Sequence, residues 1–167
     1  QWLDEEPDRL RQLLEPLADS EQRRQAINAF KDRESFLIDV EHITSDQRDP
    51  RNLANRLTAL AEILLAASVS TVAASLTERF GTPRLLNGAA CRFSVLGLGK
   101  LGGAALGYAS DLELLVVYEG PGQTGGAESK NNAEFFDQVV RDLERFIQAK
   151  HDGLFEIDLK LRPYGRD

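Results

Sequence analysis

The first half of the chain places its apolar residues at helical spacing. Over residues 8–44, leucine, isoleucine, valine and phenylalanine recur every three or four positions among dense charges. A second stripe runs over residues 53–76. It follows Asp49 and Pro50, which are typical of an N-cap and a first helical turn. Gly81 and the proline two residues later end the pattern. We predict a helical hairpin or bundle over this half.

The second half changes to the pattern of strands. Three short runs rich in apolar residues predict strands over Cys91–Leu96, Asp111–Tyr118 and Leu154–Leu161. Pro121–Lys130 is rich in glycine, serine and threonine, which predicts a mobile loop. Asn132–Lys150 carries an apolar stripe at helical spacing without interruption, which predicts an amphipathic helix.

This order of elements predicts an α+β fold. A helical segment over residues 1–84 precedes an α/β domain over residues 85–167, with a small mixed sheet and a boundary near residues 82–90. The chain starts at Gln1 without a methionine and stops at Asp167, directly after a predicted strand. We therefore expect a fragment of a larger polypeptide, with a truncated α/β domain.

Composition narrows the classes of partner. The formal net charge of −7 argues against binding nucleic acid through a broad basic surface. The single cysteine, Cys91, excludes an internal disulfide and fits a reducing, cytoplasmic compartment. No signal peptide is visible. The longest apolar run, Ile63–Ala74, is too short for a membrane span and contains serine and threonine.

Two motifs compete to define the site. The stretch "GLGKLG" that starts at Gly97 matches the dinucleotide fingerprint G-x-G-x-x-G, and Glu119 stands at the distance of a ribose-binding acid. That interpretation requires a helix over Lys100–Ala109. The helix would contain three glycines, and each costs about 1 kcal/mol relative to alanine. The dinucleotide interpretation is open but disfavoured.

The second motif is a pair of acids. On a strand, Asp111 and Glu113 point to the same face, about 6.6 Å apart along the backbone. A third acid, Asp158, lies on a strand that could pair beside the first, with Glu156 as the alternative. Carboxylates on adjacent strands behind a glycine turn are typical of two-metal phosphoryl or nucleotidyl transfer. A solvated polar strand face is the other interpretation.

The motifs together resemble a known family. The stretches "GLGKLGG" (97–103), "SDLEL" (110–114) and "DLKLRP" (158–163) are similar to those of the glutamine synthetase adenylyltransferase family. More broadly they resemble the nucleotidyltransferase superfamily related to DNA polymerase beta. The resemblance covers roughly residues 22–167, and it makes residues 85–167 a nucleotidyltransferase domain.

The resemblance implies an activity and a metal site. Members of the family add AMP from ATP to a tyrosine of glutamine synthetase in one domain and remove it by phosphorolysis in another. It implies that Asp111 and Glu113 bind Mg²⁺ ions, and that Asp158 completes the second metal site. Asp158 would also help to deprotonate the tyrosine hydroxyl, whose ordinary pKa is near 10, or orient phosphate in the reverse-type reaction. The implied partners are glutamine synthetase and a nitrogen-signalling regulatory protein.

The resemblance also implies a binding site for the nucleotide. Gly102, Gly103 and Ser110 would hold the phosphates of ATP. Lys100 and Arg162 are candidate cations, with a structural role in the domain as the alternative for each.

Several positions depart from the family pattern. Glu113 stands where aspartate is usual, Ala104-Ala105 where a basic–acidic pair is common, Lys160 where arginine is typical, and Leu37 where a helical arginine is expected. A diverged, non-catalytic nucleotide-sensing module is therefore the alternative to an adenylyltransferase or deadenylylase. The dinucleotide-binding protein is the second alternative. The direction of the reaction stays open.

Overall fold

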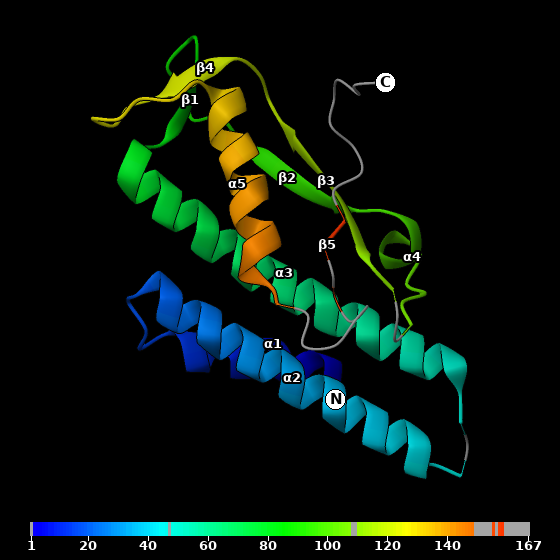
Figure 1. Ribbon diagram of the computed structural model, residues 1–167. Coiled ribbons are helices and arrows are strands. Elements are labelled where there is room, and N and C mark those ends of the chain that lie inside the picture. Colours follow the sequence, from blue (N-terminus) through cyan, green and yellow to red (C-terminus); the bar gives the residue numbers. More distant parts are fainter. Residues whose placement is uncertain (1, 47, 108–109, 149–154, 156, 159–167) are drawn as a thin grey trace.

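Three helices form the first part of the molecule in the computed structural model (Figure 1). They are α1 (Trp2–Leu14), α2 (Ser20–Thr44) and α3 (Pro50–Phe80). The structure describes residues 2–46, 48–107, 110–148, 155 and 157–158. The predicted helical first half is confirmed.

Capping residues set the ends of these helices. Asp19 caps α2 and accepts a hydrogen bond from the N–H of Gln22 at 2.9 Å. Asp49 caps α3 in the same way, so the predicted Asp49-Pro50 start is confirmed. Gly81 ends α3 with φ of 84°, a conformation that favours glycine.

Helix α3 is the centre of the core. Its buried side chains pack with those of α1 and α2 on one side and with those of the last helix on the other (Figure 1). The large apolar side chains of α2 and α3 that are fully buried are Ile27, Ile38, Leu57, Leu60 and Leu64. Burial of this stripe explains the helical periodicity of the sequence.

Helix α3 is also longer and more apolar than the sequence analysis allowed. An 18-residue window within Pro50–Phe80 has a mean hydropathy of 1.8, so by length and composition the helix could cross a membrane. Half of that window is buried inside the fold. The central helix of a packed core has the same character, and α3 occupies that place.

The strands form two small sheets. β1 (Pro83–Leu85) pairs antiparallel with β4 (Gly122–Thr124). The second sheet has the order β2 (Phe93–Gly97), β3 (Leu112–Tyr118), β5 (Ile157–Asp158). β2 and β3 are antiparallel, whereas β3 and β5 are parallel, so the predicted small mixed sheet and the α+β class are confirmed.

Helix α5 (Asn132–Phe146) connects β4 to β5 and covers one face of the mixed sheet. The ring of Phe136 stacks on Tyr118 at 4.6 Å between centroids and lies 5.2 Å from Phe93. These three rings seal the sheet against the helix. On the opposite face Leu96 and Val117 are 45% and 41% exposed.

Two predicted segments differ from the structure. The expected mobile loop over Pro121–Lys130 contains β4, because Gly122 fits against the main chain of Arg84, where a Cβ would lie 1.8 Å from its carbonyl oxygen. The helix predicted to reach Lys150 ends at Phe146, with an extended Ile147 as its C-cap.

Candidate functional site

The glycine motif forms a tight turn between two antiparallel strands. β2 ends at Gly97, and a single helical turn, α4 (Gly99–Gly102), leads back towards β3. The N–H of Leu98 donates to the carbonyl of Glu113 at 2.8 Å, which extends the pairing beyond β2. A dinucleotide fold needs a longer helix that leads to a parallel strand. In the described part of this stretch the helix spans only Gly99–Gly102. The dinucleotide interpretation, which requires a helix over Lys100–Ala109, is therefore wrong.

The acid proposed for a ribose in that interpretation has another partner. Glu119 accepts hydrogen bonds from the backbone N–H of Arg92 at 2.9 Å and from its guanidinium Nε at 2.8 Å. The side-chain hydrogen bond from Arg92 lowers the pKa of Glu119. This pair joins the two strands at the end far from the glycine turn.

Gly99 brings the turn into contact with the acidic motif. Its φ of 52° lies in the left-handed region. A Cβ at this position would lie 2.7 Å from Oε2 of Glu113. The half-buried carboxylate of Glu113 thus rests against the Cα of Gly99. Glycine is required here both for the backbone conformation and for this close approach.

The two glycines predicted to hold phosphates close the turn. The N–H of Gly102 donates to the carbonyl of Leu98 and that of Gly103 to Gly99, both at 3.0 Å. A Cβ on Gly102 would lie 2.5 Å from the carbonyl oxygen of Gly97. Their amides are engaged within the turn, so a role in binding phosphate stays a prediction. Lys100 is exposed on the same turn.

Ser110 fixes the start of β3. Its side chain is buried, and its Oγ accepts a hydrogen bond from the N–H of Gly107 at 3.0 Å. Its own N–H donates to the carbonyl of Gly107 at 3.1 Å. The next residue, Asp111, is exposed and directly precedes β3. The hydrogen bonds of Ser110 therefore fix the backbone directly before Asp111.

Strand β5 brings the third acid to this place. Its parallel register pairs Leu112 with Ile157 and Glu113 with Asp158. The main chain of Asp158 therefore lies directly beside that of Glu113, as the sequence analysis anticipated. Arg162 and the alternative acid Glu156 lie outside the described residues.

The acids at the start of β3 offer ligands for a hard cation. Leu112 and Leu114 are fully buried on the opposite face, which leaves Glu113 directed away from the core. Among the ion pairs of the described residues, none involves Asp111 or Glu113. Carboxylate oxygens free of a basic partner are what Mg²⁺ prefers. The side chains that the structure describes contain no group of three metal-ligating residues.

Comparison with known proteins identifies the family of the chain. The family model for glutamate-ammonia ligase adenylyltransferase matches residues 1–167. The chain belongs to this family. The match includes the first helices, beyond the range of about 22–167 that the motifs suggested, and it confirms membership in a family of nucleotidyltransferase enzymes.

Individual relatives show how much of a family member the chain represents. A protein of Shewanella frigidimarina is 31% identical over 169 residues, which cover 98% of this chain and 18% of the relative. A protein of Burkholderia mallei is 35% identical over 136 residues, which cover 79% of this chain and 15% of the relative. Both are named bifunctional glutamine synthetase adenylyltransferase/adenylyl-removing enzyme. The chain spans less than a fifth of the length of either.

Sequence analysis missed the glycine that lies against Glu113. It assigned the nucleotide to Gly102 and Gly103, whereas Gly99 is the glycine against Glu113. The antiparallel register of β2 and β3 contains the missing information, because it places Leu98 opposite Glu113.

Proposed function

We propose that this chain carries the site of a nucleotidyltransferase that moves AMP between ATP and a tyrosine hydroxyl of glutamine synthetase, or removes it by phosphorolysis. The observation that carries the proposal is the register of β3 and β5, which sets Asp158 beside Glu113 with Asp111 two residues upstream. The names of the family and of the two relatives support the substrate.

In this proposal the three acids share the work. Asp111 and Glu113 hold two Mg²⁺ ions, and Asp158 completes the second site. Bound Mg²⁺ neutralises phosphate charge and makes a hydroxyl more acidic. In the adenylylating direction the tyrosine oxygen forms a bond to the α-phosphorus of ATP, pyrophosphate leaves, and Asp158 takes the hydroxyl proton. In the removing direction a phosphate oxygen attacks the same phosphorus, releasing ADP and tyrosine.

The glycine turn would receive the phosphates. Lys100 is exposed on that turn and directly follows Gly99, the residue that lies against Glu113. We assign Lys100, Gly102, Gly103 and Ser110 to binding the triphosphate, together with Arg162. Ser110 would act mainly by its buried hydrogen bond with Gly107, because its Oγ is engaged there.

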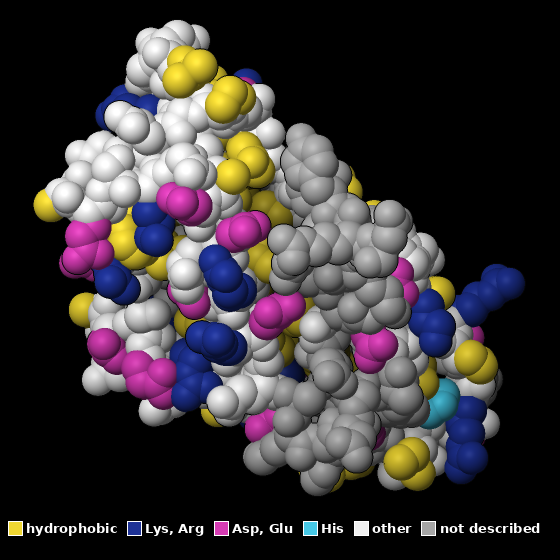
Figure 2. Space-filling model, turned by 45° about the horizontal axis from the view of Figure 1, so that its top comes forward, with side chains coloured by type: hydrophobic (Ala, Val, Ile, Leu, Met, Phe, Trp, Pro, Cys, Tyr) yellow, Lys and Arg dark blue, Asp and Glu magenta, His cyan; other side chains and the backbone are white. Residues whose placement is uncertain are grey.

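The setting proposed for this activity is the bacterial cytoplasm. Glutamine synthetase is the protein substrate, and a nitrogen-signalling regulatory protein is a further partner. We do not propose nucleic acid or a membrane as a partner. On the face seen in Figure 2 basic side chains are interspersed with acidic ones, which supports this view, as does the net charge of −7. We retain residues 1–84 as a helical segment and 85–167 as the nucleotidyltransferase domain.

The first test is titration of the chain with ATP by calorimetry, with and without Mg²⁺. We expect Mg²⁺-dependent binding that weakens at least about tenfold in Asp111→Asn, because a neutral amide is a poorer ligand for a hard cation. Asp137→Asn, an exposed aspartate on α5, is the matched control and should bind as the wild type does. Equal binding by Asp111→Asn and the control would contradict the metal site.

A second measurement separates the enzyme from a nucleotide-sensing module. The engaged amides of Gly102 and Gly103, together with Glu113 in place of the usual aspartate, favour the module as the alternative. Transfer of label from α-labelled ATP to glutamine synthetase would establish the enzyme. Mg²⁺-dependent binding without transfer in either direction would favour the module.

A further inference from the structure

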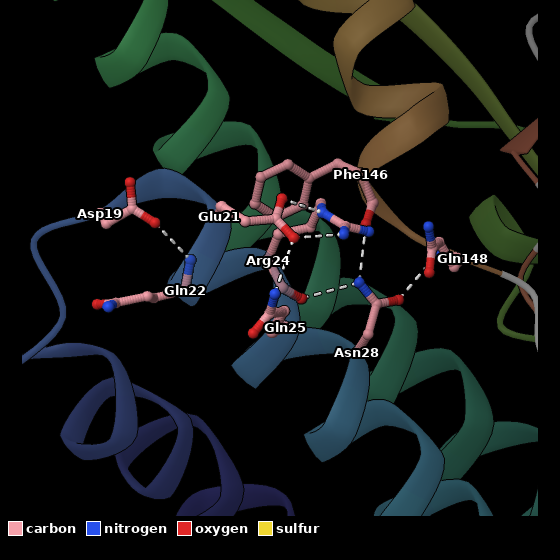
Figure 3. A network of polar contacts seen from close by, with 8 residues as sticks. All are labelled: Asp19, Glu21, Gln22, Arg24, Gln25, Asn28, Phe146 and Gln148. Carbon is pink, nitrogen blue, oxygen red and sulfur yellow. Dashed lines mark hydrogen bonds and ion pairs between the residues drawn. The ribbon is translucent and has the colours of Figure 1, made fainter.

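Helix α2 holds the end of α5 through one side chain. Asn28 donates from Nδ2 to the carbonyl of Phe146 at 2.8 Å and accepts at Oδ1 from the N–H of Gln148 at 2.8 Å (Figure 3). Nδ2 also donates to the carbonyl of Arg24, within α2, at 2.8 Å. Every polar atom of this amide is therefore engaged, and two of its three contacts fix the main chain that leaves α5.

A second side chain of α2 holds the same segment. Lys31 lies one helical turn after Asn28, and its ammonium donates to the carbonyl of Gln148. Lys31 is only 3% exposed, and Asp32 lies within 3.3 Å of its nitrogen. Gln148 is thus held at both main-chain groups, its N–H by Asn28 and its carbonyl by Lys31.

These contacts are more than helix capping requires. The last carbonyls of a helix lack partners inside the helix, and water can satisfy them. Burial of a lysine in the interior is costly unless its charge is compensated. Two polar residues of α2, one of them a buried cation, are instead directed at a segment of three residues, Phe146–Gln148. The position of this segment is therefore set by α2.

The segment precedes β5 in the sequence. Ile157 follows Gln148 nine positions later and pairs with Leu112, and the intervening Phe155 is 4% exposed. A slip of β5 by one residue would move the main chain of Asp158 away from its place beside that of Glu113.

We propose that Asn28 and Lys31 are positioning residues of the candidate site. They fix the point where the chain leaves α5, and so the register in which β5 joins β3 and sets Asp158 beside Glu113. The role in catalysis rests on the proposed function, whereas the structural effect on β5 does not. The helical first part of the molecule would thereby be a component of the site.

Hydrogen exchange tests the proposal without nucleotide. In Asn28→Ala, amides of residues 110–114 and 157–158 should exchange at least about tenfold faster than in the wild type. Amides of the β1–β4 pair, which lies at the other end of α5, should be unchanged. Gln25→Ala is the matched control, since Gln25 is on the same helix and its side chain donates a hydrogen bond to Glu21 on that helix. It should leave both regions unchanged.

A metal titration adds a second measurement, which reports on the candidate metal site itself and not on the overall stability of the fold. Mn²⁺, followed by its paramagnetic resonance signal, should bind Asn28→Ala about tenfold more weakly and Gln25→Ala as the wild type. Asn28→Asp retains the acceptor for Gln148 but loses the donor to Phe146, so it should give intermediate values. It also serves as the test variant if Asn28→Ala does not fold.

The outcomes separate this proposal from the previous one. Unchanged exchange at residues 110–114 in Asn28→Ala and Asn28→Asp would overturn the positioning role. So would an equal acceleration at β1–β4, because the effect would then be general. If the wild-type chain fails to bind ATP with Mg²⁺, the proposed function fails, while the exchange result still decides whether α2 sets β5.

Discussion

The two ends of helix α5 are held by different means. At its start, Asn131 and Glu134 form a capping box, in which each side chain accepts a hydrogen bond from the other residue's backbone N–H. The next residue, Asn132, is 1% exposed and donates to the carbonyls of Arg84 at 3.1 Å and Gly120 at 2.9 Å. The start of α5 is thus held by its own capping box and by hydrogen bonds to the main chain of Arg84 and Gly120.

The end of α5 depends on a distant part of the chain. Asn28 binds its last carbonyl and the N–H of Gln148, a residue 120 positions away. The first half of α5 also carries Phe136, which packs on Phe93 and Tyr118 of the sheet. We infer that contacts at this end stabilise the fold, whereas the polar contacts at the other end set the direction of the chain after α5. The experiments below examine this division, from the largest expected effect to the smallest.

The aromatic seal should dominate stability. Phe136→Ala removes a ring that is 2% exposed and stacks on Tyr118. We expect a loss of about 3–5 kcal/mol in the free energy of unfolding, since the cavity cannot fully collapse. Urea denaturation measures it. Phe36→Ala, at a ring 64% exposed on α2, is the matched control and should change little. Similar losses in the two variants would contradict the assignment of the core.

Loss of the buried amide at the start of α5 should cost less. Asn132→Ala leaves the carbonyls of Arg84 and Gly120 without this donor. We expect a loss of about 1–3 kcal/mol, typical of buried groups left unsatisfied. Thermal unfolding followed by circular dichroism tests this against Asn52→Ala, an exposed position on α3. Asn132→Ala should still bind Mn²⁺, because Asn132 lies at the start of α5 and not at the end held by Asn28. Loss of Mn²⁺ binding would contradict the different roles of the two ends.

The smallest effect should come from an ion pair near the end of α5. The side-chain hydrogen bond from Arg24, and then that from Gln25, lower the pKa of Glu21 from 4.5 to about 2 (Figure 3). A carboxylate with a depressed pKa in the folded state contributes stability above its unfolded pKa. That contribution is lost as pH falls from about 4.5 through about 2.

Substitution of this glutamate should flatten that dependence. Glu21→Gln should lose less stability than the wild type over the same pH interval, as measured by the midpoint of thermal unfolding. Because Glu21 is exposed and Arg24 partly so, salt at high concentration should reduce the difference between the two proteins. A larger dependence on pH in Glu21→Gln would contradict the sign of the effect.

Local patterns predicted much of the fold. The stripe of α3, the Asp49 cap and the Gly81 stop follow from helical spacing and from capping chemistry, which act over one or two turns. The position of Glu113 on the face opposite to the buried Leu112 and Leu114 follows from the period of two. Each of these properties depends on residues close together in the chain.

Contacts between distant segments were the part that local patterns could not supply. The antiparallel pairing of β2 with β3 was concealed by a glycine motif that also suits a helix. β4 is three residues long, and its pairing with β1 brings Gly122 close to the main chain of Arg84. Asn28 and Lys31 carry no local sign of their contact with Gln148, because nothing in their own helix requires it.

The pairing of Glu113 with Asp158 has a consequence for the order of folding. The two residues belong to parallel strands separated by β4, the whole of α5 and its connections. Closing so long a loop costs entropy that short-range contacts do not, so such pairings form late. The helices and the β2–β3 hairpin can form from contacts nearer in sequence. The two strands that carry the acids should therefore meet only in the last stage of folding.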